Sequence, residues 1–138
     1  MYIQNMAAIY SNLADLYFII HRPVEAEEFS FRSLEIYRRL ADTISTDIYE
    51  PDVARECNTL AILYSNSGKI KEAEKLYLEA LEIFRRLSAT EGKKNYELDL
   101  ARVCNTLANL YTYMGRLKEA EELNREAYSI NRNIRNTF

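Results

Sequence analysis

Apolar residues recur along this chain at steps of three and four positions, the spacing that places side chains on one face of an α-helix. Residues 70–88 show the pattern well, because their apolar positions form a broad stripe that a helix can bury. The pattern predicts an all-α fold of six helices in three pairs. We expect them over residues 2–20 and 23–44, from Pro51 to a turn at Gly68, and over residues 70–88, 97–114 and 117–135. The polar stretches 43–50 and 90–97 are expected to be linkers.

The same pattern returns at a fixed spacing of 47 residues. The segment 53–88 matches the segment 47 positions later at more than half of its positions, without a gap, and the segment 47 positions earlier less closely. A self-match at one spacing indicates stacked structural units that bury their apolar faces against one another. We therefore expect a single domain over residues 1–138, with repeats at about 3–49, 50–96 and 97–138.

The turn inside each helix pair is marked by a particular residue. Gly68 and Gly115 stand at the turns of the second and third pairs, and glycine readily takes the left-handed conformation that ends a helix. His21 stands at the equivalent place in the first pair, which predicts a role in helix-end geometry rather than in metal binding or catalysis. Pro23 fits the first turn of the helix that follows.

Charge and hydropathy exclude several classes of partner. The net charge is −3, which argues against nucleic acid because phosphate binding needs a basic surface. The longest apolar run, residues 16–20, is far shorter than a membrane span, and no secretory signal is visible. Cys57 and Cys104 lie one repeat apart, on equivalent helices too distant for a disulfide, so both are expected to be buried free thiols. Free thiols favour a cytoplasmic protein.

The sequence offers little material for catalysis. It has three glycines and one histidine, with no phosphate-binding glycine loop, no metal-ligand spacing and no nucleophile–histidine arrangement. We expect a protein that is not an enzyme and that uses no cofactor or metal.

The repeats resemble tetratricopeptide repeats, each of which is a helix–turn–helix. The resemblance rests on a leucine followed by a small residue and, four positions after the leucine, a tyrosine. It also rests on an alanine early in the second helix and a small residue seven positions later. In this sequence these residues are Leu13, Ala14 and Tyr17; Leu60, Ala61 and Tyr64; Leu107, Ala108 and Tyr111; Ala26, Ala73 and Ala120; and Ser33, Ala80 and Ala127.

Two departures from the usual repeat affect the expected fold. The repeat spans 47 residues rather than 34, and arginines at 38, 85 and 132 replace the proline that normally ends the second helix. This long variant is similar to the repeats of kinesin light chains and of many bacterial multi-repeat proteins. The resemblance implies a right-handed α-solenoid of three hairpins with extended second helices.

The resemblance also implies a non-catalytic scaffold that binds a peptide or partner segment in a concave groove lined by the first helix of each pair. An asparagine amide both donates and accepts hydrogen bonds, so a row of asparagines can hold an extended peptide backbone. Arginines at 55 and 102 are expected to attract an acidic ligand. The candidate groove residues are Asn12, Phe18, Ile19, Arg55, Asn58, Ile62, Asn66, Arg102, Asn105, Asn109 and Tyr113.

Two other interpretations of these residues stay open. The polar groups also fit an ordinary solvated helix surface. The adjacent Phe18 and Ile19 fit either an anchor pocket or a patch for self-association. The first helix lacks a polar outer edge, so upstream repeats or a second copy of the chain would cover it. The last helix carries polar residues at sites that are apolar in the second repeat, which predicts a C-terminal cap; these residues are Asn124, Arg125 and Asn131.

Overall fold

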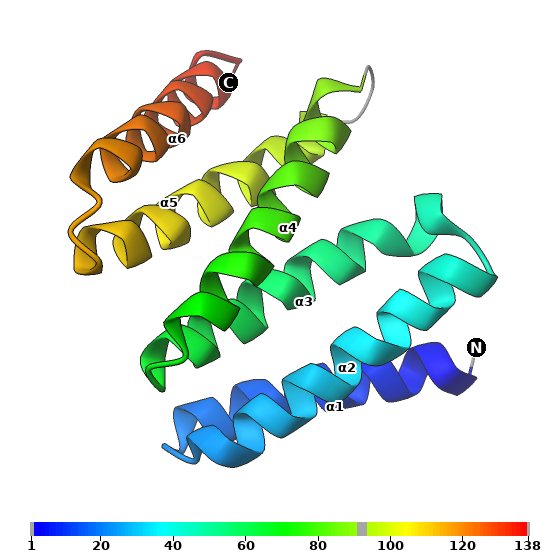
Figure 1. The fold of residues 1–138 in the computed structure, drawn as a ribbon. Coiled ribbons are helices and arrows are strands. Elements are labelled where there is room, and N and C mark those ends of the chain that lie inside the picture. Colours follow the sequence, from blue (N-terminus) through cyan, green and yellow to red (C-terminus); the bar gives the residue numbers. More distant parts are fainter. Residues whose placement is uncertain (1, 91–93, 138) are drawn as a thin grey trace.

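The computed structural model describes residues 2–90 and 94–137, and its six α-helices form three antiparallel pairs stacked one on the next (Figure 1). These described residues contain no strand, so the all-α fold is confirmed. The helices are α1 (Tyr2–Ile19), α2 (Pro23–Thr43), α3 (Thr46–Asn66), α4 (Ile70–Ala89), α5 (Glu97–Tyr113) and α6 (Leu117–Thr137), with a short 3-10 helix η1 (Lys94–Tyr96) before α5.

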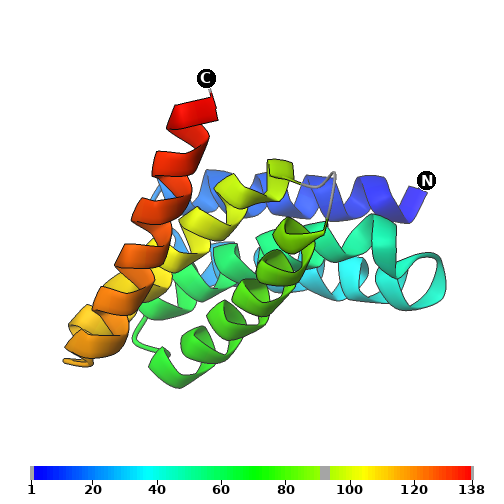
Figure 2. The ribbon, with the colours of Figure 1, turned by 90° about the horizontal axis from the view of Figure 1, so that it is seen from above.

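The stack has two layers. The first helices of the pairs, α1, α3 and α5, follow one another in one layer, and α2, α4 and α6 follow in the other (Figure 1). The layers twist along the stack, so that in Figure 2 α6 rises past α5 toward the side of α1. Leu60 and Leu107, one repeat apart, are both buried, with 1% and 0% exposed. Small side chains at Ala26 and Ala73 are fully buried and allow the paired helices to approach closely.

The start of α3 differs from the expected one. Residues 46–50, predicted to belong to a linker, are helical. Ser45 precedes the helix in an extended conformation, and its hydroxyl oxygen accepts a hydrogen bond from the Ile48 amide at 3.3 Å. That bond satisfies one of the amides that a helix start leaves unpaired. Tyr49 is 8% exposed and donates to the Gln4 side-chain oxygen at 3.2 Å, which ties the added turn to α1.

The turns between paired helices agree with the prediction. Gly68 and Gly115 have φ values of 85° and 80°, and His21, at the equivalent place, has φ 62°. All three lie in the left-handed region that reverses the chain after a helix. His21 therefore acts in helix-end geometry, as expected.

Both cysteines are buried free thiols. Burial raises the pKa of the Cys57 thiol and that of the Cys104 thiol to about 12, so both stay protonated at neutral pH. They serve as small apolar groups inside the stack, in agreement with the sequence analysis.

Candidate peptide-binding groove

The layer formed by α1, α3 and α5 carries two neighbouring hollows. The first, which we name the α1–α3 hollow, has a volume of about 200 Å³, and the second, the α3–α5 hollow, has a volume of about 450 Å³. Ile62, near the end of α3, lines both of them. The two hollows are therefore adjacent parts of one face.

The α3–α5 hollow gathers four of the predicted groove residues, Ile62, Asn66, Asn109 and Tyr113. Tyr113 is 80% exposed. Amides and hydroxyls alternate with apolar groups around the hollow, so it can form hydrogen bonds and also bury apolar surface. The remaining lining residues are Ser65, Gly68, Tyr77, Thr106 and Leu110.

Tyr77 reaches this hollow from α4 in the opposite layer. Burial raises the pKa of Tyr77 to about 12, so its hydroxyl remains protonated at neutral pH and can donate a hydrogen bond. The sequence analysis placed Tyr77 only in the apolar stripe of its helix. The apolar pattern of that helix does not predict that part of the Tyr77 side chain borders the groove.

The α1–α3 hollow is mostly apolar and contains Phe18, another predicted residue. Phe18 is 46% exposed, so part of its ring is accessible to a ligand. One carboxylate, Asp15, also lines the hollow. The other lining residues are Ala14, Thr59, Ile62 and Leu63.

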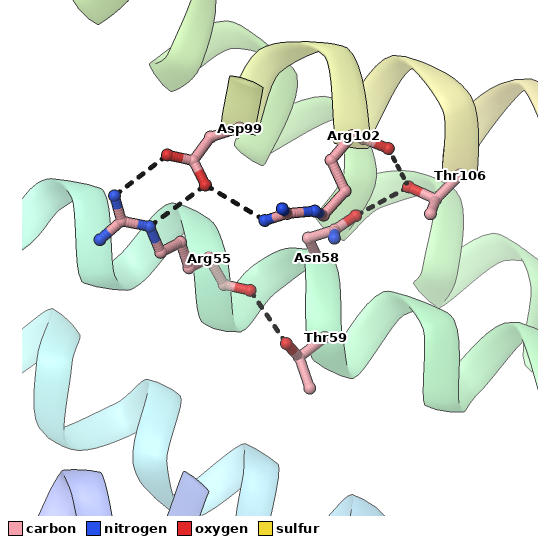
Figure 3. Close-up of polar contacts among 6 residues, drawn as sticks. All are labelled: Arg55, Asn58, Thr59, Asp99, Arg102 and Thr106. Carbon is pink, nitrogen blue, oxygen red and sulfur yellow. Dashed lines mark hydrogen bonds and ion pairs between the residues drawn. The ribbon is translucent and has the colours of Figure 1, made fainter. Parts of the chain in front are cut away.

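Asn58 takes part in packing between two helices. It is 7% exposed, and its side-chain oxygen accepts a hydrogen bond from the Thr106 hydroxyl at 2.8 Å (Figure 3). This bond joins α3 to α5 across the second and third repeats. Asn58 is therefore not an open member of the asparagine row.

The two predicted arginines share an acidic partner within the chain. Arg55 donates two hydrogen bonds to the Asp99 carboxylate, at 3.3 and 3.0 Å, and Arg102 pairs with the same carboxylate at 3.5 Å (Figure 3). Asp99 is only 9% exposed. The acid that these arginines were expected to attract from a ligand is thus already supplied by α5.

The remaining predicted residues, Asn12, Ile19 and Asn105, are exposed on α1 and α5 but line neither hollow. Sequence reasoning missed the pairing role of Asp99. A signal was available, because Asp99 follows Arg55 by 44 residues. The repeat is 47 residues long, so Asp99 stands three positions before the residue of α5 that is equivalent to Arg55. Three positions are about one helical turn, which brings the two side chains within reach of each other on neighbouring helices.

The described part of the chain has no group of three or more His, Cys, Asp and Glu side chains that could hold a metal ion. No helix in it is long and apolar enough to cross a membrane.

Comparison with known protein families agrees with this architecture. The model of the family described as tetratricopeptide repeat matches residues 52–133, which cover the second and third helix pairs. The chain belongs to the tetratricopeptide repeat family. Repeats of this family generally mediate protein–protein interaction and are typically non-catalytic.

A solved structure has the same fold over nearly the whole of this tetratricopeptide repeat chain. It is the crystal structure of BtubC (BKLC) from P. vanneervenii, with 25% sequence identity and a TM-score of 0.77. The similarity covers 94% of this chain and 48% of BtubC, so the chain spans about half of that protein's length. No curated protein sequence matches the chain.

Proposed function

We propose that this tetratricopeptide repeat domain binds an extended segment of a partner protein across the two hollows of the α1–α3–α5 layer. The observation that carries the proposal is the continuity of the hollows. Because Ile62 lines both, one ligand can extend from Phe18 on α1 to Tyr113 on α5. Its general class, protein–protein interaction, is that of the family.

The chemistry of the hollows indicates what each part of the ligand would contribute. The α1–α3 hollow, with Phe18 and Leu63, suits an apolar side chain. In the α3–α5 hollow, Asn66 and Asn109 can each donate to and accept from peptide groups whatever the ligand's sequence. An acidic ligand that engaged Arg55 and Arg102 would have to displace Asp99.

The proposal can be tested with peptides of defined sequence. Peptides are selected on the immobilised domain from a random phage-displayed library, then synthesised with a fluorophore and titrated by anisotropy. Replacing Asn66 and Asn109 together with alanine is expected to raise the Kd by about tenfold, since each lost hydrogen bond weakens binding by about 0.5–1.5 kcal/mol.

The matched control is Asn131→Ala, which removes an exposed asparagine of α6 that lines neither hollow. It is expected to leave the Kd unchanged. Failure to select any binding peptide would contradict the proposal. So would equal binding by the control and by a double variant that keeps its helical circular dichroism spectrum.

Self-association through α1 is a second candidate function. It is favoured by apolar exposure on this helix, where Ile19 is 69% and Phe18 46% exposed. Light scattering over a wide concentration range separates the two candidates. A chain that stays monomeric throughout removes self-association, and growth in mass that Ile19→Glu abolishes supports it.

A further inference from the structure

The outer face of the first helix pair exposes positions that are buried in the following pair. Tyr2, Ile9 and Leu16 recur every seventh residue along α1 and are 79%, 51% and 50% exposed. The residues 47 positions later, Tyr49, Glu56 and Leu63, are 8%, 4% and 5% exposed. We name the contact between one pair and the next a seam, and the outer face of α1 and α2 the end face.

Two charge pairs recur at both seams of the stack. One joins an arginine of the earlier pair to a glutamate of the later pair. Arg38 pairs with Glu79 at 2.5 Å across the first seam, and Arg85 pairs with Glu126 at 2.6 Å across the second. The earlier pair thus supplies the cation at this site, and the later pair supplies the acid.

The other recurrent pair has the opposite polarity. Glu27 pairs with Lys69 at 2.9 Å across the first seam, and Glu74 pairs with Arg116 at 2.8 Å across the second. Each seam therefore requires one acid and one cation from the earlier helix pair, at fixed positions.

At the end face, one of these two positions carries the same charge as in the seams, and the other carries the opposite charge. Arg22 stands where Lys69 and Arg116 stand, and its guanidinium lies 5.4 Å from the centre of the Tyr17 ring. Arg32, however, stands where Glu79 and Glu126 stand. A helix pair packed on this face in the same register would therefore need an acid opposite Arg22 and, in place of the usual cation, a second acid opposite Arg32.

The space beside Arg32 is also changed. Tyr10 occupies the site of the two buried cysteines, and the Arg32 guanidinium lies 5.9 Å from its ring centre. A long arginine from a covering helix pair would meet both the bulk of Tyr10 and the charge of Arg32. A shorter acidic side chain avoids the clash and reverses the electrostatic sign.

We propose that the end face docks a helical hairpin from outside residues 1–138 that carries an acid at both seam positions. The hairpin covers Tyr2, Ile9 and Leu16 with apolar side chains and opposes Arg22 and Arg32 with carboxylates. This surface lies at the end of the stack and is separate from the hollows proposed to bind peptides. At present Arg32 pairs with Glu28 on its own helix at 2.6 Å, an exposed contact of the weak kind that a partner's acid can replace.

A second copy of this chain does not meet these requirements. In the seam register its last helix, α6, would bring Glu121 to Arg22, which suits the site. It would also bring Arg132 to Arg32, which places like charges together. The polar Asn124 would face the apolar Ile9, because the equivalent residues of the first seam, Ser30 and Glu56, are in contact. The occupant is therefore a different hairpin.

Substitutions in α6 can give this chain the apolar and acidic side chains that the proposed hairpin would carry. Sedimentation equilibrium then measures how tightly the α6 end of one copy binds the end face of another. The basic probe carries Asn124→Tyr and Asn131→Phe, which copy the aromatic residues of the second repeat onto α6. The acidic probe adds Arg132→Glu. The acidic probe is expected to associate head to tail about tenfold more tightly than the basic one, and salt is expected to reduce the difference.

A charge reversal on the end face completes the test. With Arg32→Glu the preference is expected to switch, so that the basic probe associates more tightly. Leu16→Glu is expected to weaken association of both probes. Equal association of the two probes, an unchanged preference with Arg32→Glu, or monomers throughout would overturn the proposal.

Circular dichroism verifies that each probe is folded. Should the aromatic substitutions prevent folding, the wild-type chain and its Arg132→Glu variant are compared instead, because residue 132 is exposed. The variant is expected to associate more tightly than the wild type but less tightly than the acidic probe, since it keeps Asn124. The groove variant with Asn66 and Asn109 replaced is expected to leave this association unchanged. The experiments therefore test peptide binding in the hollows and hairpin docking on the end face separately.

Discussion

At the scale of single residues, the most unusual group is a glutamate buried in the first seam. Glu56 is 4% exposed, and its carboxylate accepts hydrogen bonds from the hydroxyls of Ser30 at 2.8 Å and Ser11 at 3.0 Å. Burial raises the pKa of Glu56; the two serine bonds act against this rise, and Asp15 and Asp52 add to it. The folded state therefore favours the protonated carboxyl more than the unfolded state does.

This shift predicts a specific pH dependence. The contribution of Glu56 to the free energy of unfolding is most favourable below its unfolded pKa, about 4.3. It is lost as the pH rises from there through the raised folded pKa. Glu56→Gln removes the titration, so the variant is expected to gain stability relative to wild type between acid and neutral pH. Urea titrations of both proteins at several pH values measure that difference. A difference that is constant with pH, or that has the opposite slope, contradicts the assignment.

At the scale of helices and turns, His21 is in a conformation that glycine adopts more easily. A left-handed residue with a β-carbon is strained by about 1–2 kcal/mol, and the greater freedom of unfolded glycine offsets part of that. His21→Gly is therefore expected to raise the free energy of unfolding by about 0.5–1 kcal/mol. Thermal unfolding monitored by circular dichroism measures the change. The reciprocal control, Gly68→His at φ 85°, is expected to lower stability, and a loss of stability in His21→Gly would refute this account.

Helix boundaries could be predicted from the sequence wherever a local signal decides them. The turns at His21, Gly68 and Gly115 were identified because a left-handed residue leaves a recognisable pattern. The start of α3 was predicted too late, because Pro51 is typical of a first helical turn. The Ser45 cap and the burial of Tyr49 extend the helix past that signal. Burial of Tyr49 depends on contact with α1, which no local pattern reports.

In the groove, too, features set by local sequence could be predicted, whereas features set by contacts between repeats could not. The resemblance to tetratricopeptide repeats implied a groove that included Phe18, Ile62, Asn66 and Asn109, and all four line the hollows. It also offered Arg55 and Asn58 as free ligand-binding groups, although both have partners on α5. Those partners lie 44 and 48 residues away, so only the register between repeats determines the contacts.

At the scale of the whole molecule, recurrent charge pairs connect the three repeats. Arg38→Glu places two acids together at the first seam and is expected to lower the free energy of unfolding by about 1 kcal/mol, since the pair is still partly open to solvent. Adding Glu79→Arg restores opposite charges and is expected to recover most of the loss. Urea unfolding of both single variants and the double variant gives the coupling energy.

The equivalent exchange of Arg85 and Glu126 at the second seam serves as the matched control. It is expected to behave in the same way, because the geometry of the pair repeats. A double variant that is no more stable than the singles at either seam would show that the pairs are incidental.

The two seams have similar surface charge pairs but different buried residues, and this difference determines whether the protein tolerates deletion of a repeat. Unequal recombination that deleted the middle 47-residue unit would join the first hairpin directly to the third. The surface pairs would re-form, because Arg38 would meet Glu126 and Glu27 would meet Arg116. The interior would not match: Ser30, now beside the Glu56 carboxylate, would face Val103, which is 1% exposed. A hydroxyl left without a partner inside the protein lowers stability, so a chain shortened in this way is expected to be less stable than one that keeps all three helix pairs.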